Sequence, residues 1–370
     1  MQRFQSKPRY DILDGLRGVA ALMVIVYHVF ECFDWSPVPH GYLAVDFFFV
    51  LSGFVIGYAY DSRWGEGLTI GQFFKRRLIR LHPMVVIGAL IGALCFFLQG
   101  GVRWDGTPVA TGWVMVAMLL AMFMLPLYPG AAADVRGNGE MFPLNGPTWS
   151  LFFEYIGNIL YALLLRRSPT RWLAVIALVS GGTLAYIAVS DGYLGVGWSM
   201  VDGGLWSGLV RMLFPYTMGM LMARVFRPVK GVRAAFWLCG AVILLVGCVP
   251  LVFGDLQPWQ GGLYDALCVI LVFPCLVWLG ASLQSLGTAT QRVSYFLGEL
   301  SYPLYAVHYP LMYLFYAHIG FDGNLVPLAR LNDVWPVAVA LPLACILLAW
   351  LCWRFYDRPV RRYLTRHSST

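Results

Sequence analysis

Arg17 and His28 stand eleven positions apart in the first long apolar segment, DGLRGVAALMVIVYH. At about 100° per residue, eleven positions turn a helix by about three full turns plus ~20°, so both side chains share one helix face. Their separation along the axis is roughly 16 Å, about half the hydrocarbon thickness of a bilayer. We therefore expect Arg17 at the membrane edge and His28 near the middle. A titratable base beneath a fixed cation indicates chemistry at a membrane-embedded site, with His28 as a general base.

Two carboxylates lie inside apolar segments, where an ionisable side chain needs a partner or a function. Asp46 stands in GYLAVDFFFVLSGF, where Ser52 and Gly53 let helices approach closely. Glu154 stands in NGPTWSLFFEY, and at that depth an unpaired carboxylate would become protonated. Either carboxylate can pair with an arginine, or orient His28 as the carboxylate of a catalytic triad orients its histidine. For Asp46, a simple packing role is an equal alternative.

Two further clusters have both a functional and a structural interpretation. Arg77 and Arg80 in FFKRRLIRLHP are i and i+3 on one helix face, at the entrance to the third segment. They form either an ordinary basic collar or a clamp for phosphate, which guanidinium groups bind in a bidentate manner. In GELSYPLYAVHYPL, Tyr302 and Tyr305 fit an aromatic belt equally well, and His308 follows Tyr305 by three positions.

The composition shows which kind of fold must position these residues. Of 370 residues, 59% are hydrophobic and 12% are charged, which is about half the charge of an ordinary soluble domain. We predict an all-α, polytopic bundle of transmembrane helices. The net charge of +7 does not indicate nucleic-acid binding, because the cations cluster in short loops. The eight cysteines lie mostly in apolar runs without a close CxxC pair, so we predict neither disulfides nor a metal site.

Apolar runs long enough to cross a bilayer occur eleven times. They are 14–33, 42–60, 80–99, 111–128, 147–166, 172–190, 207–226, 234–253, 264–283, 301–319 and 335–356. Lys and Arg gather at the N-terminus (Arg3, Lys7, Arg9), in 63–80, 166–171 and 224–233, around Arg292 and at the C-terminus, and all these places should be cytoplasmic. We expect Arg211 at a membrane interface.

An even number of spans must separate cytoplasmic loops, yet three apolar segments lie between Arg80 and Arg166. Either 111–128 is re-entrant or one segment is broken. We therefore predict about ten spans, with both termini cytoplasmic and the first segment retained as a helix. The loops are short and no repeat is evident, which indicates one membrane domain over 1–370 with a core of about 10–360.

Five stretches resemble, in order, motifs of the acyltransferase 3 family of integral-membrane proteins. DGLRGVAALMVIVYH resembles the opening motif, whose Arg and His are that family's functional pair, and VDFFFVLSGF resembles the second-helix motif. The segment from Arg77 to Arg80 resembles the RxxR element, TWSLFFE the WSLxxE element and LSYPLYAVHYPL the SYxxYLxH element. Two departures are Asp357, where Glu is commoner, and His82. No hydrolase-like domain follows the membrane region, so the chain resembles the stand-alone form.

The resemblance implies transfer of an acyl group, often acetyl, from acyl-CoA to a hydroxyl of a carbohydrate or glycolipid; some members acylate macrolide-type natural products. It implies no bound cofactor, and a multi-pass protein of the bacterial inner membrane. The catalytic candidates are His28, Arg17 and Glu154. The candidates for substrate binding are Asp14, Asp46, Ser52, Arg77, Arg80, Trp149, Ser150, Tyr302, Tyr305 and His308.

The implied mechanism is direct transfer. Arg17, Arg77 and Arg80 would bind the phosphates of acyl-CoA at the cytoplasmic face, and the thioester arm would reach inward to His28. Alternatively, Arg17 pairs with Asp14 to hold the helix end. A rival class is a transporter or flippase of an acyl group or lipid-linked sugar, which would favour internal repeats and helices broken near the midplane. A third is a non-catalytic acceptor-binding protein, against which Arg17 and His28 together argue.

Overall fold

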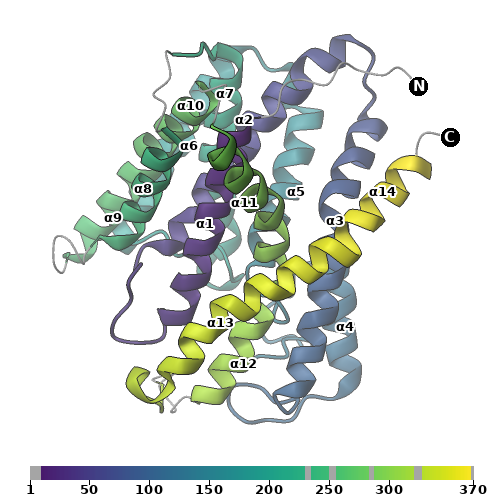
Figure 1. Ribbon diagram of the computed structural model, residues 1–370, viewed down its shortest axis with the longest axis vertical. Helices are drawn as coiled ribbons and strands as arrows, with labels where there is room; N and C mark the ends of the chain where they lie inside the picture. The colour runs from purple at the N-terminus through teal and green to yellow at the C-terminus, as the bar shows by residue number, and fades with distance from the viewer. Residues whose placement is uncertain (1–9, 230–234, 250–255, 283–286, 321–326, 368–370) are drawn as a thin grey trace.

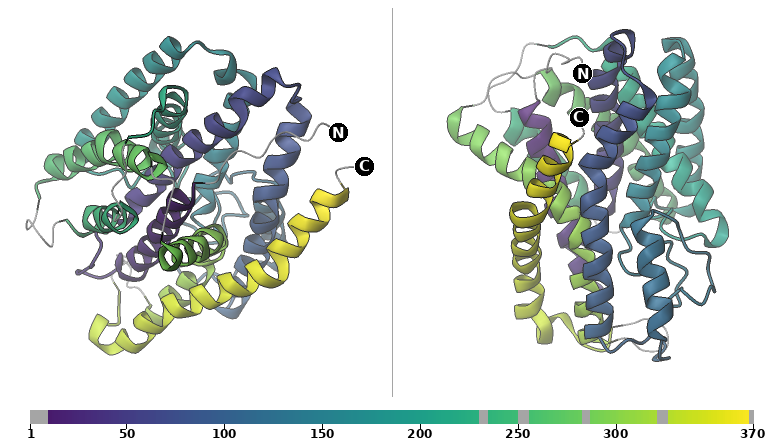
Figure 2. Two further views of the ribbon diagram at one scale, coloured as in Figure 1. Left: turned by 45° about the horizontal axis from the view of Figure 1, so that its top comes forward. Right: turned by 90° about the vertical axis from the view of Figure 1, so that its right-hand side faces the viewer.

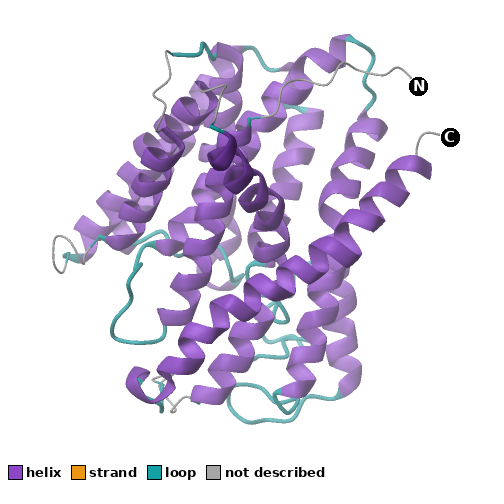
Figure 3. Ribbon diagram, viewed as in Figure 1, coloured by secondary structure: helices purple, strands orange, loops and turns teal. Residues whose placement is uncertain are grey.

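The computed structural model describes residues 10–229, 235–249, 256–282, 287–320 and 327–367. Within these ranges the chain forms helices joined by loops, without a β-strand (Figure 3), so the all-α prediction is confirmed. The basic residues Arg3, Lys7, Arg9, Lys230 and Arg233, and the end of the apolar segment 234–253, lie outside the described residues.

The α-helices are numbered along the chain (Figure 1). They are α1 (Asp11–Phe30), α2 (Ala44–Gly65), α3 (Ile70–Leu98), α4 (Thr111–Met122), α5 (Thr148–Leu163), α6 (Thr170–Asp191), α7 (Gly204–Val225), α8 (Ala235–Cys248), α9 (Pro258–Leu267), α10 (Phe273–Ser282), α11 (Thr288–Val307), α12 (Tyr309–Ile319), α13 (Leu331–Cys352) and α14 (Arg358–His367). π-Helical turns at Cys268–Val272 and Trp353–Asp357 join α9 to α10 and α13 to α14.

Six helical stretches are long and apolar enough to cross a membrane, which makes the chain an integral membrane protein. They are Asp11–Phe30, Gly41–Gly65, Ile70–Leu98, Thr170–Asp191, Pro258–Ser282 and Leu331–His367. The apolar segment 111–128 is different, because its helix α4 has only 12 residues. A helix of that length rises about 18 Å, short of the ~30 Å hydrocarbon core. It is followed by the irregular segment 123–147.

Helix α3 begins ten residues before the predicted segment at 80. A capping box explains this start: the Thr69 hydroxyl accepts a hydrogen bond from the Gln72 amide, and the Gln72 side chain accepts one from the Thr69 amide. Arg77 and Arg80 are therefore inside the helix, two to three turns from its start, rather than at its entrance.

The bundle is held together by close helix crossings. At the α2–α7 crossing, a Cβ on Gly53 would lie 2.0 Å from the Tyr216 carbonyl oxygen, and one on Gly219 would lie 2.1 Å from the Val50 carbonyl oxygen. Only glycine permits backbones this close, so the approach predicted at Gly53 is confirmed. Helix α1 lies beside α11 and runs in the same direction, because residues near the starts of both helices meet, as do residues near the ends of α1 and α12.

The connections gather at two ends of the bundle. The α2–α3 connection lies at the upper end in Figure 1, and the 123–147 segment lies at the lower end near the end of α1. At the upper end, Arg224 pairs with Asp61 at 2.9 Å and donates hydrogen bonds to the Leu165 and Ser168 carbonyl oxygens. These contacts bring the basic loops around 63, 166 and 224 together.

Candidate active site

Three neighbouring cavities form a row through the bundle. The basic vestibule is lined by Asp14, Arg17, Arg63, Arg80, Tyr302 and Arg361, among others. The middle cavity is lined by Arg17, Ser52, Arg77, Arg80, Ser150, Glu154, Tyr302 and Tyr305, among others. The aromatic cavity is lined by His28, Glu31, Tyr42, Glu140, Trp149, Trp198, Arg211, Tyr305 and Tyr309, among others.

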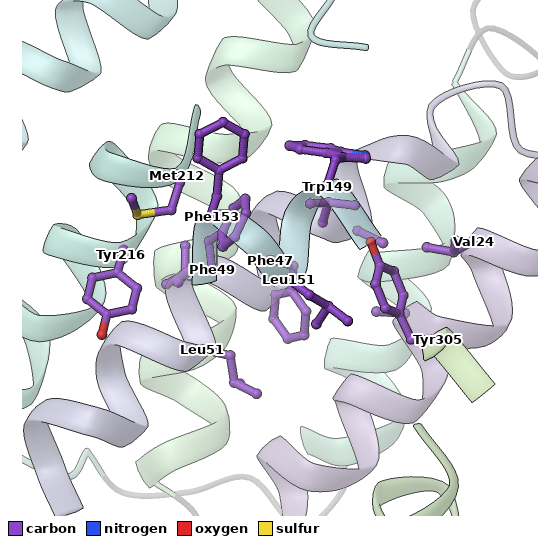
Figure 4. Close-up of a cluster of buried hydrophobic side chains, with 14 of the residues drawn as sticks. Val24, Phe47, Phe49, Leu51, Trp149, Leu151, Phe153, Met212, Tyr216 and Tyr305 are labelled. Carbon is purple, nitrogen blue, oxygen red and sulfur yellow. The ribbon is translucent and has the colours of Figure 1, made fainter. Parts of the chain in front are cut away.

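Shared residues make the row continuous. Arg17, Arg80 and Tyr302 line both the vestibule and the middle cavity. Val45 and Tyr305 line both the middle and the aromatic cavity. Figure 4 shows Tyr305 beside Leu151, which lines the middle cavity, with Trp149, which lines the aromatic cavity, above them in this view. The row therefore brings together every predicted site residue except Asp46 and His308, which are buried beside it.

Arg17 is held mainly by α11. Its Nε donates to the Ser301 hydroxyl at 2.7 Å and its Nη2 to the Gly298 carbonyl oxygen at 2.8 Å, with Asp14 at 3.5 Å. These partners fix the guanidinium group where the vestibule meets the middle cavity. The expected pair with Asp14 is present, and Arg17 also faces the cavities.

Glu154 pairs with Arg77 and not with His28. Arg77 Nη2 lies 2.6 Å from Glu154 Oε1, and the Ser52 hydroxyl donates to the same oxygen at 3.0 Å. The pair joins α3 to α5 and α2 in the wall of the middle cavity. Arg77 thus has a carboxylate partner, whereas Arg80 lines the vestibule.

Asp46 pairs with Arg211, which confirms the arginine-pairing alternative for Asp46 and corrects the expectation for Arg211. Arg211 Nη2 lies 2.8 Å from Asp46 Oδ2, its Nε donates to both carboxylate oxygens, and it also donates to the carbonyl oxygens of Val196 and Tyr42. Arg211 is only 2% exposed, so it is not an interfacial arginine. The approach of Asp46 to Arg211, 165 residues away, leaves Asp46 unable to orient His28.

His28 lies two residues before the end of α1, not near its middle. The helix ends at Phe30, and His28 lines the aromatic cavity. The helix begins and ends about three residues earlier than the predicted segment 14–33. Arg17 lines the vestibule and the middle cavity, whereas His28, further along the same helix, lines the aromatic cavity.

The carboxylate partner of His28 is Glu31, which sequence reasoning missed. His28 Nδ1 lies 2.8 Å from Glu31 Oε1, and the Tyr316 hydroxyl donates to that oxygen at 2.7 Å. Burial raises the pKa of Glu31, but the charge of His28 and hydrogen bonds from His28, Tyr316 and Tyr27 outweigh it and leave the pKa below its usual value. Because an ionised carboxylate only accepts, Nδ1 is the nitrogen that donates to Glu31, which leaves Nε2 as the nitrogen for substrate chemistry. The sequence contained the information needed to predict this pair, because Glu31 is an ionisable residue within the predicted span, at i+3 from His28.

His308 and the tyrosines are interior residues. His308 is fully buried at the junction of α11 and α12; its Nδ1 bonds the carbonyl oxygens of Leu304 and Tyr305, and its ring stacks on His28 with 5.5 Å between centroids. The Tyr305 and Ser150 hydroxyls are 2.6 Å apart, and Tyr302 donates to the Leu81 carbonyl oxygen. The aromatic-belt alternative for these tyrosines is therefore wrong.

Buried polar groups fix the loops around the aromatic cavity. Asp265 accepts hydrogen bonds from His40, Tyr42 and the Leu194 amide. Glu140 accepts from Tyr313 and, at 2.8 Å, from Asn138. None of these residues stood out in the sequence, since the partners of Asp265 and the Tyr313 partner of Glu140 come from distant segments.

A helical membrane protein with arginines, carboxylates and an imidazole along a row of cavities has the groups that a membrane enzyme of group transfer would use. The sequence profile described as "Acyltransferase domain" matches residues 10–354, so the chain belongs to the acyltransferase 3 family and is an acyltransferase of groups other than aminoacyl.

Three curated proteins illustrate the similarity. "Protein 2 in picA locus" of Rhizobium radiobacter is 36% identical over 196 residues, covering 50% of this chain and 97% of that protein. Acyltransferase MdmB of Streptomyces mycarofaciens is 28% identical over 246 residues, covering 59% of this chain and 58% of MdmB. Peptidoglycan O-acetyltransferase OatA of Listeria monocytogenes is 38% identical over 84 residues, covering 22% of this chain and 13% of OatA. The chain thus spans less than two thirds of the latter two. No solved structure matches it.

Proposed function

We propose that this protein transfers an acyl group, acetyl in the simplest case, from acyl-CoA to a hydroxyl of a carbohydrate or glycolipid, with His28 as general base. The observation that carries the proposal is the His28–Glu31 pair at one end of a row of cavities whose other end is lined by arginines. A polyanionic donor suits the arginine end, and a proton transfer suits the other.

The difference between the arginine end and the His28–Glu31 end also supports a membrane topology. In the proposed topology, ten crossings are assigned to α1, α2, α3, α5, α6, α7, α8, α9 with α10, α11 with α12, and α13 with α14, and the 12-residue α4 is not counted as a crossing. The start of α1 and the end of α14 then lie on the same side as the basic loops, which the positive-inside rule assigns to the cytoplasm of a bacterial inner membrane.

The chemistry proceeds by direct transfer. Nε2 of His28 takes the proton of the acceptor hydroxyl as its oxygen attacks the thioester carbonyl carbon. The carbon–sulfur bond then breaks, and the sulfur leaves as CoA thiol with the proton that His28 returns. Glu31 holds the imidazole in the tautomer that presents Nε2, as a triad carboxylate does. Glu154 contributes by fixing Arg77, and Tyr305 lies where the arm passes from the middle to the aromatic cavity.

The aromatic cavity supports a sugar as acceptor. Trp149, Tyr193 and Trp198 supply flat apolar faces, and Glu140 and Asn138 supply polar groups that can bond hydroxyls. The name of the relative OatA, a peptidoglycan O-acetyltransferase, points to the same class of acceptor.

The test is turnover of radiolabelled acetyl-CoA by purified protein in nanodiscs, with a soluble glycan acceptor. His28→Ala should lower transfer by roughly 10²–10⁴-fold, because it removes the base. The matched control is His318→Ala, an exposed histidine on α12 whose loss should leave turnover unchanged. Near-wild-type transfer by His28→Ala would contradict the assignment of His28 as general base. Movement of label without covalent transfer would favour a transporter.

A further inference from the structure

A strongly basic cleft lies between α3 and α14, outside the row of cavities. It is lined by Arg76, Ile79 and Arg80 of α3 and by Arg358, Arg361, Arg362, Thr365 and Arg366 of α14. Six of these eight residues are arginines, and none of the residues described along the cleft is acidic. The right-hand view of Figure 2 shows α14 lying against the side of α3 near the end of the chain.

The spacing aligns the arginines in two facing rows. Arg358, Arg362 and Arg366 follow one another at i+4 on α14, and Arg76 and Arg80 are i and i+4 on α3. Like charges at this spacing repel one another, so neither row stabilises its own helix. A bound polyanion would reverse that repulsion, because each guanidinium group can form charge-assisted hydrogen bonds to phosphate.

One arginine of the cleft already has a carboxylate partner. Asp357, in the π-helical turn before α14, is fully buried, and its Oδ2 lies 2.6 Å from Arg361 Nη2. The pair is i and i+4 on one continuous helical stretch, so it fixes the Arg361 side chain beside the start of α14.

The cleft connects with the row of cavities through two shared arginines. Arg80 and Arg361 line both the cleft and the vestibule, and Arg80 also lines the middle cavity. A ligand with its charged head in the cleft can therefore extend a neutral arm inward. Acyl-CoA has this form, with a 3′-phosphate and a diphosphate at one end and the thioester at the tip of the pantetheine arm.

We propose that the α3–α14 arginine cleft binds the 3′-phosphoadenosine diphosphate end of acyl-CoA, and so determines the affinity of the donor. The proposal rests on the proposed function. It also changes the phosphate clamp that the sequence predicted at Arg77 and Arg80. Arg77 is held by Glu154 and Arg361 by Asp357. The partners of Arg80 in phosphate binding are therefore the other arginines of α14, which are Arg358, Arg362 and Arg366.

The experiment compares acetyl-CoA with acetyl-dephospho-CoA, which lacks the 3′-phosphate. In Arg362→Gln with Arg366→Gln, the KM for acetyl-CoA should rise roughly tenfold or more, with kcat within about twofold, because a charged hydrogen bond is lost without touching the reacting atoms. The variant should also lose the wild-type preference for acetyl-CoA over acetyl-dephospho-CoA. Arg171→Gln and Arg292→Gln remove exposed arginines that do not line the cleft, and should leave KM unchanged.

A phospholipid headgroup shares the phosphate chemistry, so the assay is run in nanodiscs of phosphatidylcholine alone and with added phosphatidylglycerol. A KM effect in phosphatidylcholine alone supports the donor site; an effect only with phosphatidylglycerol assigns the cleft to lipid and overturns the proposal. An unchanged KM and preference also overturn it, while wild-type turnover keeps the proposed function intact. A third outcome separates the two proposals. If the wild type shows no turnover but binds 3′,5′-ADP, and the double variant loses that binding, the cleft is a phosphate site and the proposed acyltransferase activity is contradicted.

Discussion

The two ends of the row of cavities are built on different principles. At the basic end, Arg17, Arg80 and the arginines of α14 project from regular helices, and most of the α14 side chains are open to solvent. At the aromatic end, His28 and Glu31 sit among loops fixed by buried polar pairs. Under the proposed function the contrast has a physical reason: binding an anion depends on charge density, which tolerates movement, whereas a proton transfer needs a base fixed within a fraction of an ångström.

The largest expected effect is at a buried pair of the aromatic end. Asp46→Asn leaves the Arg211 charge buried without its carboxylate, so the free energy of unfolding should fall by about 3–5 kcal/mol. Thermal melting in detergent measures this. Asp105→Asn, at an exposed carboxylate in a loop, is the matched control and should melt like the wild type. A melting temperature of Asp46→Asn equal to that of the control would contradict the account of a fixed end.

Next in size is the loss of the carboxylate that orients the base. Glu31→Gln should lower kcat by roughly 10²-fold or more with little change in KM for acetyl-CoA. The neutral amide no longer stabilises a charged imidazole, and its NH2 can donate to Nδ1, which favours the tautomer with the proton on Nε2. Steady-state kinetics on folded protein measure both constants. Glu66→Gln removes an exposed carboxylate at the other end of the bundle and should change neither. A rise in KM without a fall in kcat would show that Glu31 binds substrate instead of positioning His28.

A smaller effect is expected where the two ends meet. Tyr305→Phe removes one hydroxyl from the pair with Ser150, so kcat/KM should fall by about fivefold, the value of one neutral hydrogen bond. Tyr186→Phe on the exposed face of α6 is the control. A loss as large as that of His28→Ala would mean that Tyr305 takes part in the proton transfer itself.

The smallest expected effect is that of salt, which should weaken donor binding at the basic end and leave the chemistry at the aromatic end unchanged. Added NaCl should raise the KM for acetyl-CoA several-fold and leave kcat unchanged, because exposed charges are screened at about 8–10 Å in ordinary buffers and buried pairs much less. Initial rates across a salt series measure it. A parallel loss of kcat would place exposed charges in the chemical step and remove the contrast between the ends.

Much of the fold was predictable because a membrane span is set by length and apolarity. The segments that became α5, α6 and α7 agree with their predicted bounds within three residues. The start of α3 was missed because its first turns contain the polar residues Gln72, Lys75 and Arg76, which are not typical of a membrane span. The T-x-x-Q pattern of a capping box at Thr69 nevertheless indicates that start.

The site was predictable in part. The shared face of Arg17 and His28 follows from helix geometry alone and holds in the structure. The pairs Arg77 with Glu154 and Asp46 with Arg211 join residues 77 and 165 positions apart, and which cation meets which carboxylate is decided by tertiary packing. Glu31 was available from helical spacing, but its role depends on Tyr316 of α12 and on the end of α1 at Phe30.

The central claim is that acyl-CoA enters from the arginine end and reacts at the His28 end. The most direct measurement uses sealed vesicles of both orientations, sorted by a protease-sensitive tag after α14, with a membrane-impermeant glycan acceptor enclosed. Labelled acetyl-CoA added outside should modify the enclosed acceptor only in vesicles that expose the α14 end, and His28→Ala should abolish the transfer. Equal labelling in both orientations, or transfer only when donor and acceptor share one face, would contradict the account.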